Sequence, residues 1–177
     1  MVHLHDDHGP AARQRALSKV PHAGDAPCAL YSFALVVCRH PATGRYLLVQ
    51  EFCNQGFWLP GGRVDAGESL TSAAVRETKE EAGVDVRLKG ILSLEHKPYK
   101  SRQGHYVRMR LIFYAEPIDP NQIPKSRADF ESAGASWCSA QDIEGLRLRG
   151  SEPLIWSRYL ENGGSIYPLS LLNERNA

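Results

Sequence analysis

The sequence contains no apolar run long enough to cross a membrane as a helix, which would need about 20 predominantly apolar residues, and no internal repeat or low-complexity segment. It also carries little net charge, +1 at pH 7. No overall field would therefore draw the chain to a nucleic-acid polymer or to an anionic membrane. Any anionic ligand must be held by local groups, and we expect neither of those two partners.

Cysteine is scarce as well. The four cysteines lack the spacing of metal-binding motifs and lie mostly in apolar stretches, so we expect reduced thiols in or near the core; they are Cys28, Cys38, Cys53 and Cys138. The segment MVHLHDDHGPAARQRALSKV lacks the apolar centre of a secretory signal, and its two adjacent aspartates disfavour a transit peptide. The expected location is the cytoplasm.

Length and composition favour one compact domain. With 177 residues, of which 42% are hydrophobic and 23% charged, the chain can bury a sizeable core but is short for two typical domains. We expect a flexible tail over residues 1–24 and a single domain over residues 25–177. Three histidines in the tail, His3, His5 and His8, could form a weak metal site, but their setting is more typical of a solvated tail.

Acidic residues gather on one predicted helix. Glu77, Glu80 and Glu81 stand at i, i+3 and i+4, so a helix places all three on one face. Two turns earlier, the apolar residues at positions 70, 73 and 74 occupy the same face. Buried charge without compensation is costly, and a bound divalent cation would remove the cost.

A solvated lattice of salt bridges is the alternative, with Arg76 paired to Glu80 and Glu77 to Lys79. The residues around the helix favour the metal site instead. Breaker clusters at positions 59–62 and 65–67 precede the helix, Ser69 is a suitable N-cap, and Gly83 is placed to end it. The pattern predicts a loop, a helix and a second loop, with Glu68 at the helix entrance.

This segment resembles the signature of the Nudix family. The matching residues, at the correct spacing, are Gly62, Glu68, Arg76, Glu77, Glu80, Glu81, Gly83 and Val84. Thr78 replaces the usual aliphatic residue, a change that we expect to affect packing more than chemistry. A match at so many fixed positions is far more specific than a lone glycine-rich loop.

The remaining sequence predicts strands and helices in an order that fits this resemblance. We expect strands over residues 29–37, 45–52, 85–96 and 105–116 and around Trp137, with a basic loop at 97–104 and an irregular segment at 117–136. In the strand over 105–116, alternate residues should face the core while the other face carries Arg108 and Arg110. Helices should follow Ser139 and cover 153–162, and the apolar tail SIYPLSLL should dock on the body. The fold class is α/β, and the resemblance implies a Nudix α/β/α sandwich with a mixed central sheet and a loop-helix-loop metal site.

The resemblance implies a hydrolase that cleaves a nucleoside diphosphate linked to another moiety, with water attacking at phosphorus. Mg²⁺ or Mn²⁺ suits a cluster of oxygen ligands. By position, Glu77 and Glu81 are the expected principal ligands, Glu80 a further ligand or water activator, Glu68 an outer ligand, and the Gly61 carbonyl one more ligand.

Candidates outside the helix come next. Glu131 is the expected additional acid, because the resembling proteins carry one several residues before a tryptophan-bearing strand; a solvated loop residue is the alternative. Arg108 and Arg110 suit phosphate oxygens, or they form an exposed strand face. Aromatic residues that could stack on a base, or belong to the core, are Trp58, Phe57 and Tyr106.

The resemblance implies that the substrate is a small phosphoanhydride. Short patches between residues 28 and 172 resemble the Nudix branch that acts on 8-oxo-guanine nucleoside diphosphates, which favours an oxidised nucleotide such as 8-oxo-dGDP or dGTP. Alternative substrates are diphosphoinositol polyphosphates, nucleotide sugars and capped RNA, for which a basic cluster at Lys97, Lys100, Arg102, Arg108 and Arg110 is the available feature. A non-catalytic nucleotide sensor is the alternative of another class, and a homodimer stays open.

Overall fold

The computed structural model of the chain describes residues 28–102 and 104–173. The elements within them, in order, are β1 (Ala29–Cys38), β2 (Tyr46–Glu51), β3 (Gly56–Trp58), β4 (Gly61–Arg63), α2 (Leu70–Ala82), β5 (Val86–Ser101), β6 (Gly104–Pro117), β7 (Gly134–Cys138), α3 (Ala140–Gly145), α4 (Glu152–Glu161) and the short 3-10 helix η1 (Leu169–Leu171). The predicted tail over residues 1–24, with its histidines, lies outside the described residues, so the predicted domain boundary stays a prediction.

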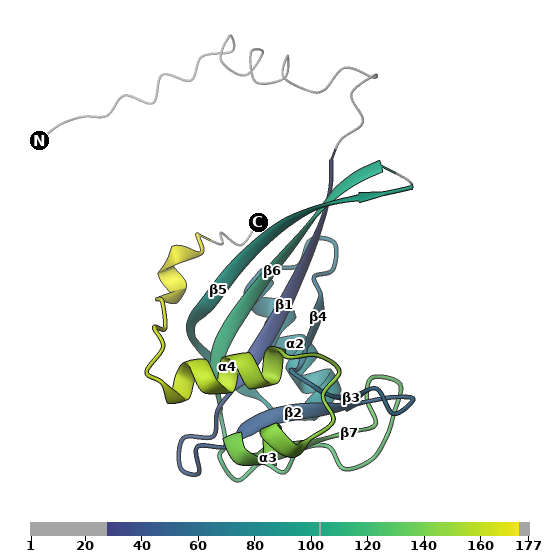
Figure 1. Ribbon diagram of the computed structural model, residues 1–177. Helices are drawn as coiled ribbons and strands as arrows, with labels where there is room; N and C mark the ends of the chain where they lie inside the picture. The colour runs from purple at the N-terminus through teal and green to yellow at the C-terminus, as the bar shows by residue number, and fades with distance from the viewer. Residues whose placement is uncertain (1–27, 103, 174–177) are drawn as a thin grey trace, which may run out of the picture.

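The strands of the described residues form two sheets (Figure 1). In the larger sheet the order is β4-β1-β6-β5, with β1 and β6 parallel and the other neighbours antiparallel. The smaller sheet has the order β3-β2-β7 and is antiparallel. The predicted α/β fold with a mixed sheet is confirmed, and the sheet is divided into two parts.

Helices cover both faces of the larger sheet. Side chains on one face pack with α2 in a core that includes Ala34, Val36, Ala73, Ala74, Leu111 and Phe113. Side chains on the other face pack with α3 and α4 in a core that includes Leu35, Val37, Ile112, Ile143, Leu154 and Trp156. Successive residues of β1 and β6 therefore enter different cores.

This double burial decides between two open interpretations. The face of β6 that carries Arg108 and Arg110 could bind phosphate or be an exposed strand face, and the second is wrong because Ile112 on that face is fully buried and Arg110 is only 8% exposed. The reason is α4, which packs against this side of the sheet, as its place in front of β1 in Figure 1 shows.

The loop predicted over residues 97–104 is also wrong, because β5 and β6 continue as a paired hairpin to Ser101 and Gly104. Tyr99 and Tyr106 stack across the two strands with ring centroids 5.2 Å apart, and cross-strand aromatic pairs of this kind stabilise a hairpin. The hairpin extends away from the helices together with the start of β1, which pairs with β6 from Tyr106 onward (Figure 1). Its charged residues made the sequence look like a loop.

The ends of α2 are confirmed as predicted. Ser69 accepts a hydrogen bond from the Ser72 N–H at 3.0 Å, and Gly83 ends the helix in the left-handed region with φ 72°. Thr78 is fully buried, and its hydroxyl donates to the Ala74 carbonyl at 2.7 Å. The departure from the family pattern is thus accommodated inside the helix itself. Among the helices described, none is long and apolar enough to cross a membrane.

The segment after α4 docks on the sheet, as predicted. Ile91 and Tyr167 exchange two backbone hydrogen bonds of 2.8 Å, and Leu169 and Leu172 pack against the core next to α2. Gly90 permits this approach, since a Cβ there would collide with Ile166.

The cysteine prediction is half correct. All four are free, and Cys38 and Cys138 are buried, but Cys28 and Cys53 are exposed. Burial raises the pKa of the Cys38 thiol, with a smaller contribution from the charge of Glu116. Cys38 is therefore an inert core residue.

Candidate functional site

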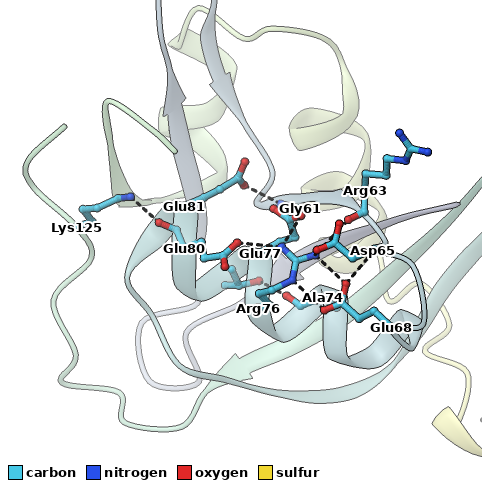
Figure 2. A network of polar contacts seen from close by, with 11 residues as sticks. Gly61, Arg63, Asp65, Glu68, Ala74, Arg76, Glu77, Glu80, Glu81 and Lys125 are labelled. Carbon is cyan, nitrogen blue, oxygen red and sulfur yellow. Dashed lines mark hydrogen bonds and ion pairs between the residues drawn. The ribbon is translucent and has the colours of Figure 1, made fainter. Parts of the chain in front are cut away.

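Arg76 lies at the centre of the acidic cluster (Figure 2). Its guanidinium group contacts three glutamates of the predicted set. Nε and Nη2 donate to the two carboxylate oxygens of Glu68 at 2.9 and 2.8 Å, and Nη1 donates to Glu77 and to Glu80, each at 2.9 Å. Nη2 also donates to the carbonyl of Arg63 at 3.2 Å. The guanidinium group therefore neutralises part of the acidic cluster.

These contacts decide which acids are available to a cation. Within the described residues, no group of three or more His, Cys, Asp or Glu side chains is arranged to hold a metal ion as it stands. The hydrogen bonds from Arg76 hold the pKa of Glu68 below its usual range. Glu80, predicted to lie on the buried face, has a side chain that is 42% exposed. Glu68 and Glu80 are thus committed mainly to Arg76.

Glu81 lies on the other side of the cluster and points to the loop before the helix (Figure 2). Its Oε2 accepts a hydrogen bond from the Gly61 N–H at 2.8 Å, and no ion pair involves it within the described residues. Burial raises the pKa of Glu81 to about 8; the bond from Gly61 opposes this shift, and nearby carboxylates add to it. A partly buried acid without a cationic partner is the kind of group that a metal ion stabilises.

The two glycines of β4 bring the backbone close to the acids. A Cβ at Gly62 would lie 2.5 to 2.7 Å from the carboxylate atoms of Glu77. Gly61 has a φ of 143°, and a Cβ there would overlap the Ala34 carbonyl. Both positions need glycine, one for the backbone of β1 and the other for the carboxylate of Glu77.

Two more acids raise pKa values in the cluster: Glu131 acts on both Glu77 and Glu81, and Glu51 acts on Glu81. The charges of Glu51 and Glu131 both raise the pKa of Glu81, after burial and together with the charge of Glu77. Burial is also the main cause that raises the pKa of Glu77, and the charges of Glu80 and Glu131 add to it. The structure therefore places Glu131, which is distant in sequence, within electrostatic reach of Glu77 and Glu81.

The donor set fits a hard divalent cation. Mg²⁺ and Mn²⁺ bind carboxylate and carbonyl oxygens and keep part of their water. Glu77, Glu81 and the carbonyl of Gly61 supply such oxygens, while Glu131 and Glu51 add negative charge nearby. The space that a Cβ would fill at Gly62 already holds the carboxylate of Glu77 against the loop.

A cavity of about 280 Å³ opens beside the same loop. Its lining combines the two glycines with apolar and basic side chains: Phe33, Leu35, Trp58, Gly61, Gly62, Arg108, Arg110 and Arg149. The volume is near the lower end of ligand pockets, about 300 to 1,000 Å³. A larger hollow of about 600 Å³ lies on the outer side of α2, where Glu68 and Arg76 line it but Glu77 and Glu81 do not. The smaller cavity is the one that adjoins the Gly61–Gly62 loop.

The two candidate arginines differ in their pairing. Arg110 donates from Nε and Nη2 to Glu95 at 2.8 and 2.5 Å, and it also forms an ion pair with Glu152 of α4. Arg108 lies over the ring of Phe33 at 5.0 Å, and its Nε is buried without a hydrogen-bond partner in the described part of the chain. The charge of Arg110 is neutralised, and only Arg108 is carried forward as an anion-binding candidate.

The three aromatic candidates differ in their position relative to the cavity. Trp58 lines the cavity, with the guanidinium carbon of Arg149 5.7 Å from its ring centre. Phe57 packs in the core next to α4. Tyr106 lies on the hairpin against Tyr31 and Tyr99, outside the lining of this cavity. We therefore retain Trp58 as a stacking candidate and not Tyr106.

Sequence reasoning missed Glu51 and Arg149. Glu51 ends β2, and the Arg149 Nη1 donates to its Oε1 at 2.8 Å. A glutamate at the end of an apolar strand was visible, but nothing in the sequence indicated that it would face the helix. Arg149 is brought to the cavity because its backbone N–H donates to the Phe57 carbonyl at 3.0 Å, an arrangement without a sequence signal.

Comparison with known families matches residues 31–156 to the NUDIX domain. Among curated relatives, the 8-oxo-dGDP phosphatase NUDT18 of Homo sapiens is 36% identical over 94 residues, which are 51% of this chain and 27% of that protein. Phosphatase NudJ of Escherichia coli is 30% identical over 145 residues, 80% of this chain and 90% of that protein. The chain spans only between 27% and 36% of the length of the relatives from nematode, human and plant.

Among solved structures, a NUDIX hydrolase from Nitrosomonas europaea has a TM-score of 0.63 at 21% identity and covers 83% of this chain and 98% of that one. At this identity the likeness concerns the fold. It agrees with the α/β architecture described above.

The raised pKa of Glu81 makes the stability of the metal-free protein depend on pH. Between pH 4.5, the ordinary pKa of a glutamate, and about pH 8, the folded protein keeps a proton on Glu81 that the unfolded chain has released. The stability that this proton provides is therefore fully present below that range and is lost as the pH rises through it. We expect Glu81→Gln to stabilise the metal-free protein by about 1 to 3 kcal/mol near pH 9 and to change it little near pH 5. Urea unfolding at both pH values measures this. Glu144→Gln, in an exposed ion pair, is the control, and an equal effect at both pH values would contradict the pKa assignment.

No other side chain should replace the guanidinium group of Arg76 without a loss of stability. Arg76→Lys keeps the charge but cannot reach Glu68, Glu77 and Glu80 together, and we expect it to lower the free energy of unfolding by about 1 to 3 kcal/mol. Arg158→Lys makes the same change in an exposed pair with Glu144 and should cost less than about 0.5 kcal/mol. Thermal unfolding compares the two. Equal losses of stability in the two variants would show that the Arg76 network contributes no more than an exposed ion pair.

Proposed function

The chain belongs to the Nudix family, and from this premise we propose that it hydrolyses the diphosphate linkage of a nucleoside diphosphate derivative with Mg²⁺ or Mn²⁺ as cofactor. The observation that carries the proposal is the position of Glu77 and Glu81 against the Gly61–Gly62 loop, next to a cavity that contains Arg108. Oxygen ligands for a cation and a nitrogen donor for an anion thus adjoin the same loop.

Glu77, Glu81 and the Gly61 carbonyl are the proposed cation ligands. When bound, a divalent ion supplies charge neutralisation for the diphosphate and lowers the pKa of a coordinated water. In the reaction, the oxygen of a water molecule forms a bond to one phosphorus, the bridging P–O bond breaks, and its electron pair leaves with the other phosphate. The water proton passes to a carboxylate, for which Glu131 and Glu80 are the candidates because both are exposed beside the ligand pair.

The leaving or retained nucleotide would enter the cavity. Arg108 lines the cavity and would donate to a phosphate oxygen from its guanidinium group, and Trp58 would stack on the base. The human relative is by name an 8-oxo-dGDP phosphatase, which favours an oxidised guanine nucleotide as the first substrate to test.

The inositol alternative loses its main support. Lys97, Lys100 and Arg102 lie on the β5–β6 hairpin or at its turn and do not line the cavity, and Lys97 pairs with Glu95 at 3.1 Å. The basic residues that suggested a highly anionic substrate therefore do not form one pocket. A nucleotide sugar, capped RNA or a sensor function remain as outcomes of the test below.

We also propose a cytoplasmic location. Two exposed free cysteines, Cys28 and Cys53, suit a reducing compartment.

The proposal predicts metal-dependent turnover that requires both ligand glutamates. In ¹⁸O-labelled water with Mg²⁺ or Mn²⁺, a panel of nucleoside diphosphates, oxidised guanine nucleotides, nucleotide sugars, capped RNA and ADP-ribose should include at least one substrate whose label appears in a single product. Glu77→Gln and Glu81→Gln should each lower kcat on the order of 100-fold or more, whereas Glu144→Gln should match the parent.

Mass spectrometry of the products reports the substrate class and the phosphorus that is attacked. Undiminished turnover in either variant would overturn the assigned roles. Nucleotide binding without turnover in the parent protein would favour the sensor instead.

Arg108 should affect substrate binding more than chemistry. Removing its charge with Arg108→Gln should raise KM for a nucleotide by about tenfold and leave kcat within about threefold. Arg87→Gln, an exposed position on β5, is the matched control. Steady-state kinetics that show a loss in kcat alone would assign Arg108 to another role.

A further inference from the structure

The segment between β6 and β7, residues 118–133, closes the C-terminal end of α2. The last carbonyls of a helix have no partners inside the helix and need donors from elsewhere. Here side chains and backbone of this one segment supply four of them: Lys125 Nζ donates to the Glu80 carbonyl at 2.5 Å, Ser132 Oγ to Glu81 at 2.6 Å, Lys125 N–H to Ala82 at 2.8 Å and Gln122 Nε2 to Gly83 at 2.8 Å.

Lys125 has a second set of contacts within the segment. Its Nζ donates to both carboxylate oxygens of Asp129, each at 2.8 Å. Asp129 Oδ1 in turn accepts from the backbone N–H of Glu131 at 2.9 Å and of Ser132 at 3.3 Å. One ammonium group therefore connects the helix end at Glu80 with the turn that carries Glu131, and Figure 2 shows Lys125 directed at this end of the helix.

The turn is anchored from other sides as well. Ser132 is 1% exposed, the Ala133 N–H donates to the Gln50 carbonyl at 3.0 Å, and the Ala135 N–H donates to the Lys125 carbonyl at 2.8 Å. The Glu131 side chain itself is exposed. Its backbone position is thus fixed against α2 and β2, while its carboxylate remains accessible.

We propose that Lys125 and Asp129 are positioning residues that hold Glu131 beside Glu77 and Glu81. This inference rests on the proposed function, because it assigns Glu131 a part in the same site. A pair that served only to stabilise the helix would lower stability when broken, whatever residue stood at position 131. If the pair positions Glu131, breaking it lowers activity only in a protein that has Glu131.

A double-mutant cycle separates these two roles. The variants are Asp129→Ala, Glu131→Gln and the two together. We expect Asp129→Ala to lower kcat about tenfold with KM within about twofold, and to weaken Mn²⁺ binding, measured by calorimetry on the protein without substrate. In the Glu131→Gln background, the same change should alter kcat and Mn²⁺ affinity by less than about twofold.

Asp119→Ala is the matched control. Asp119 lies in the same segment, and within the described residues its side chain accepts one local hydrogen bond, from the Asn121 N–H at 2.8 Å, so this variant should match the parent. Lys125→Arg, which retains a charged donor, should keep most of the activity that Lys125→Met loses. These two Lys125 variants test the same positioning role if Asp129→Ala folds poorly.

The inference is overturned if Asp129→Ala has the same effect with and without Glu131, if Asp119→Ala is equally damaging, or if Glu131→Gln changes neither kcat nor Mn²⁺ affinity. Each of these results leaves the proposed hydrolase standing, provided that the parent turns over and Glu77→Gln and Glu81→Gln do not. If the parent hydrolyses nothing, the proposed function fails, and the Mn²⁺ affinities of the same four proteins still decide the cycle.

Discussion

The crowding of carboxylates around α2 is the constraint on which the rest of the site depends. Like charges at this spacing repel, and the structure meets the repulsion in two ways. Arg76 neutralises Glu68, Glu80 and part of Glu77, whereas Glu81 is partly buried without a cationic partner in the described residues, and its pKa rises. The negative charge of the first group is therefore neutralised within the protein itself. The carboxylate of Glu81 is left with an affinity for a proton or for a cation from solution. This division separates the residues that build the site from those that would bind at it.

Much of the fold could be predicted from the sequence because its signals are local. The caps of α2 at Ser69 and Gly83 depend on residues next to the helix, and the structure has both where the sequence placed them. The errors arose where packing overrides local pattern. Charged residues suggested a loop at 97–104, but cross-strand pairing extends the hairpin. Alternation left a solvent face on β6 open as one alternative, but α4 covers it and pairs with Arg110.

The site was predictable to the extent that it lies within one continuous motif. Spacing on the helix brought out Glu77, Glu80 and Glu81, although it could not show that Glu80 is drawn outward by Arg76. Residues from other elements were harder to find. Glu51 reaches the site through the pairing of β2, and Arg149 through the hydrogen bonds of its backbone to β3. Neither arrangement has a counterpart in sequence spacing, because each depends on how distant segments meet.

The missing side chain at Gly62 has a consequence for how this protein tolerates mutation. A single methyl group there would occupy the volume in which the Glu77 carboxylate now lies. Since that carboxylate is at the end of a flexible side chain, it could swing aside at small energetic cost to the fold. Replacement of this glycine by alanine would thus be a lesion that leaves a folded, expressible protein with a displaced ligand, so abundance in the cell would be a poor guide to whether the site is intact.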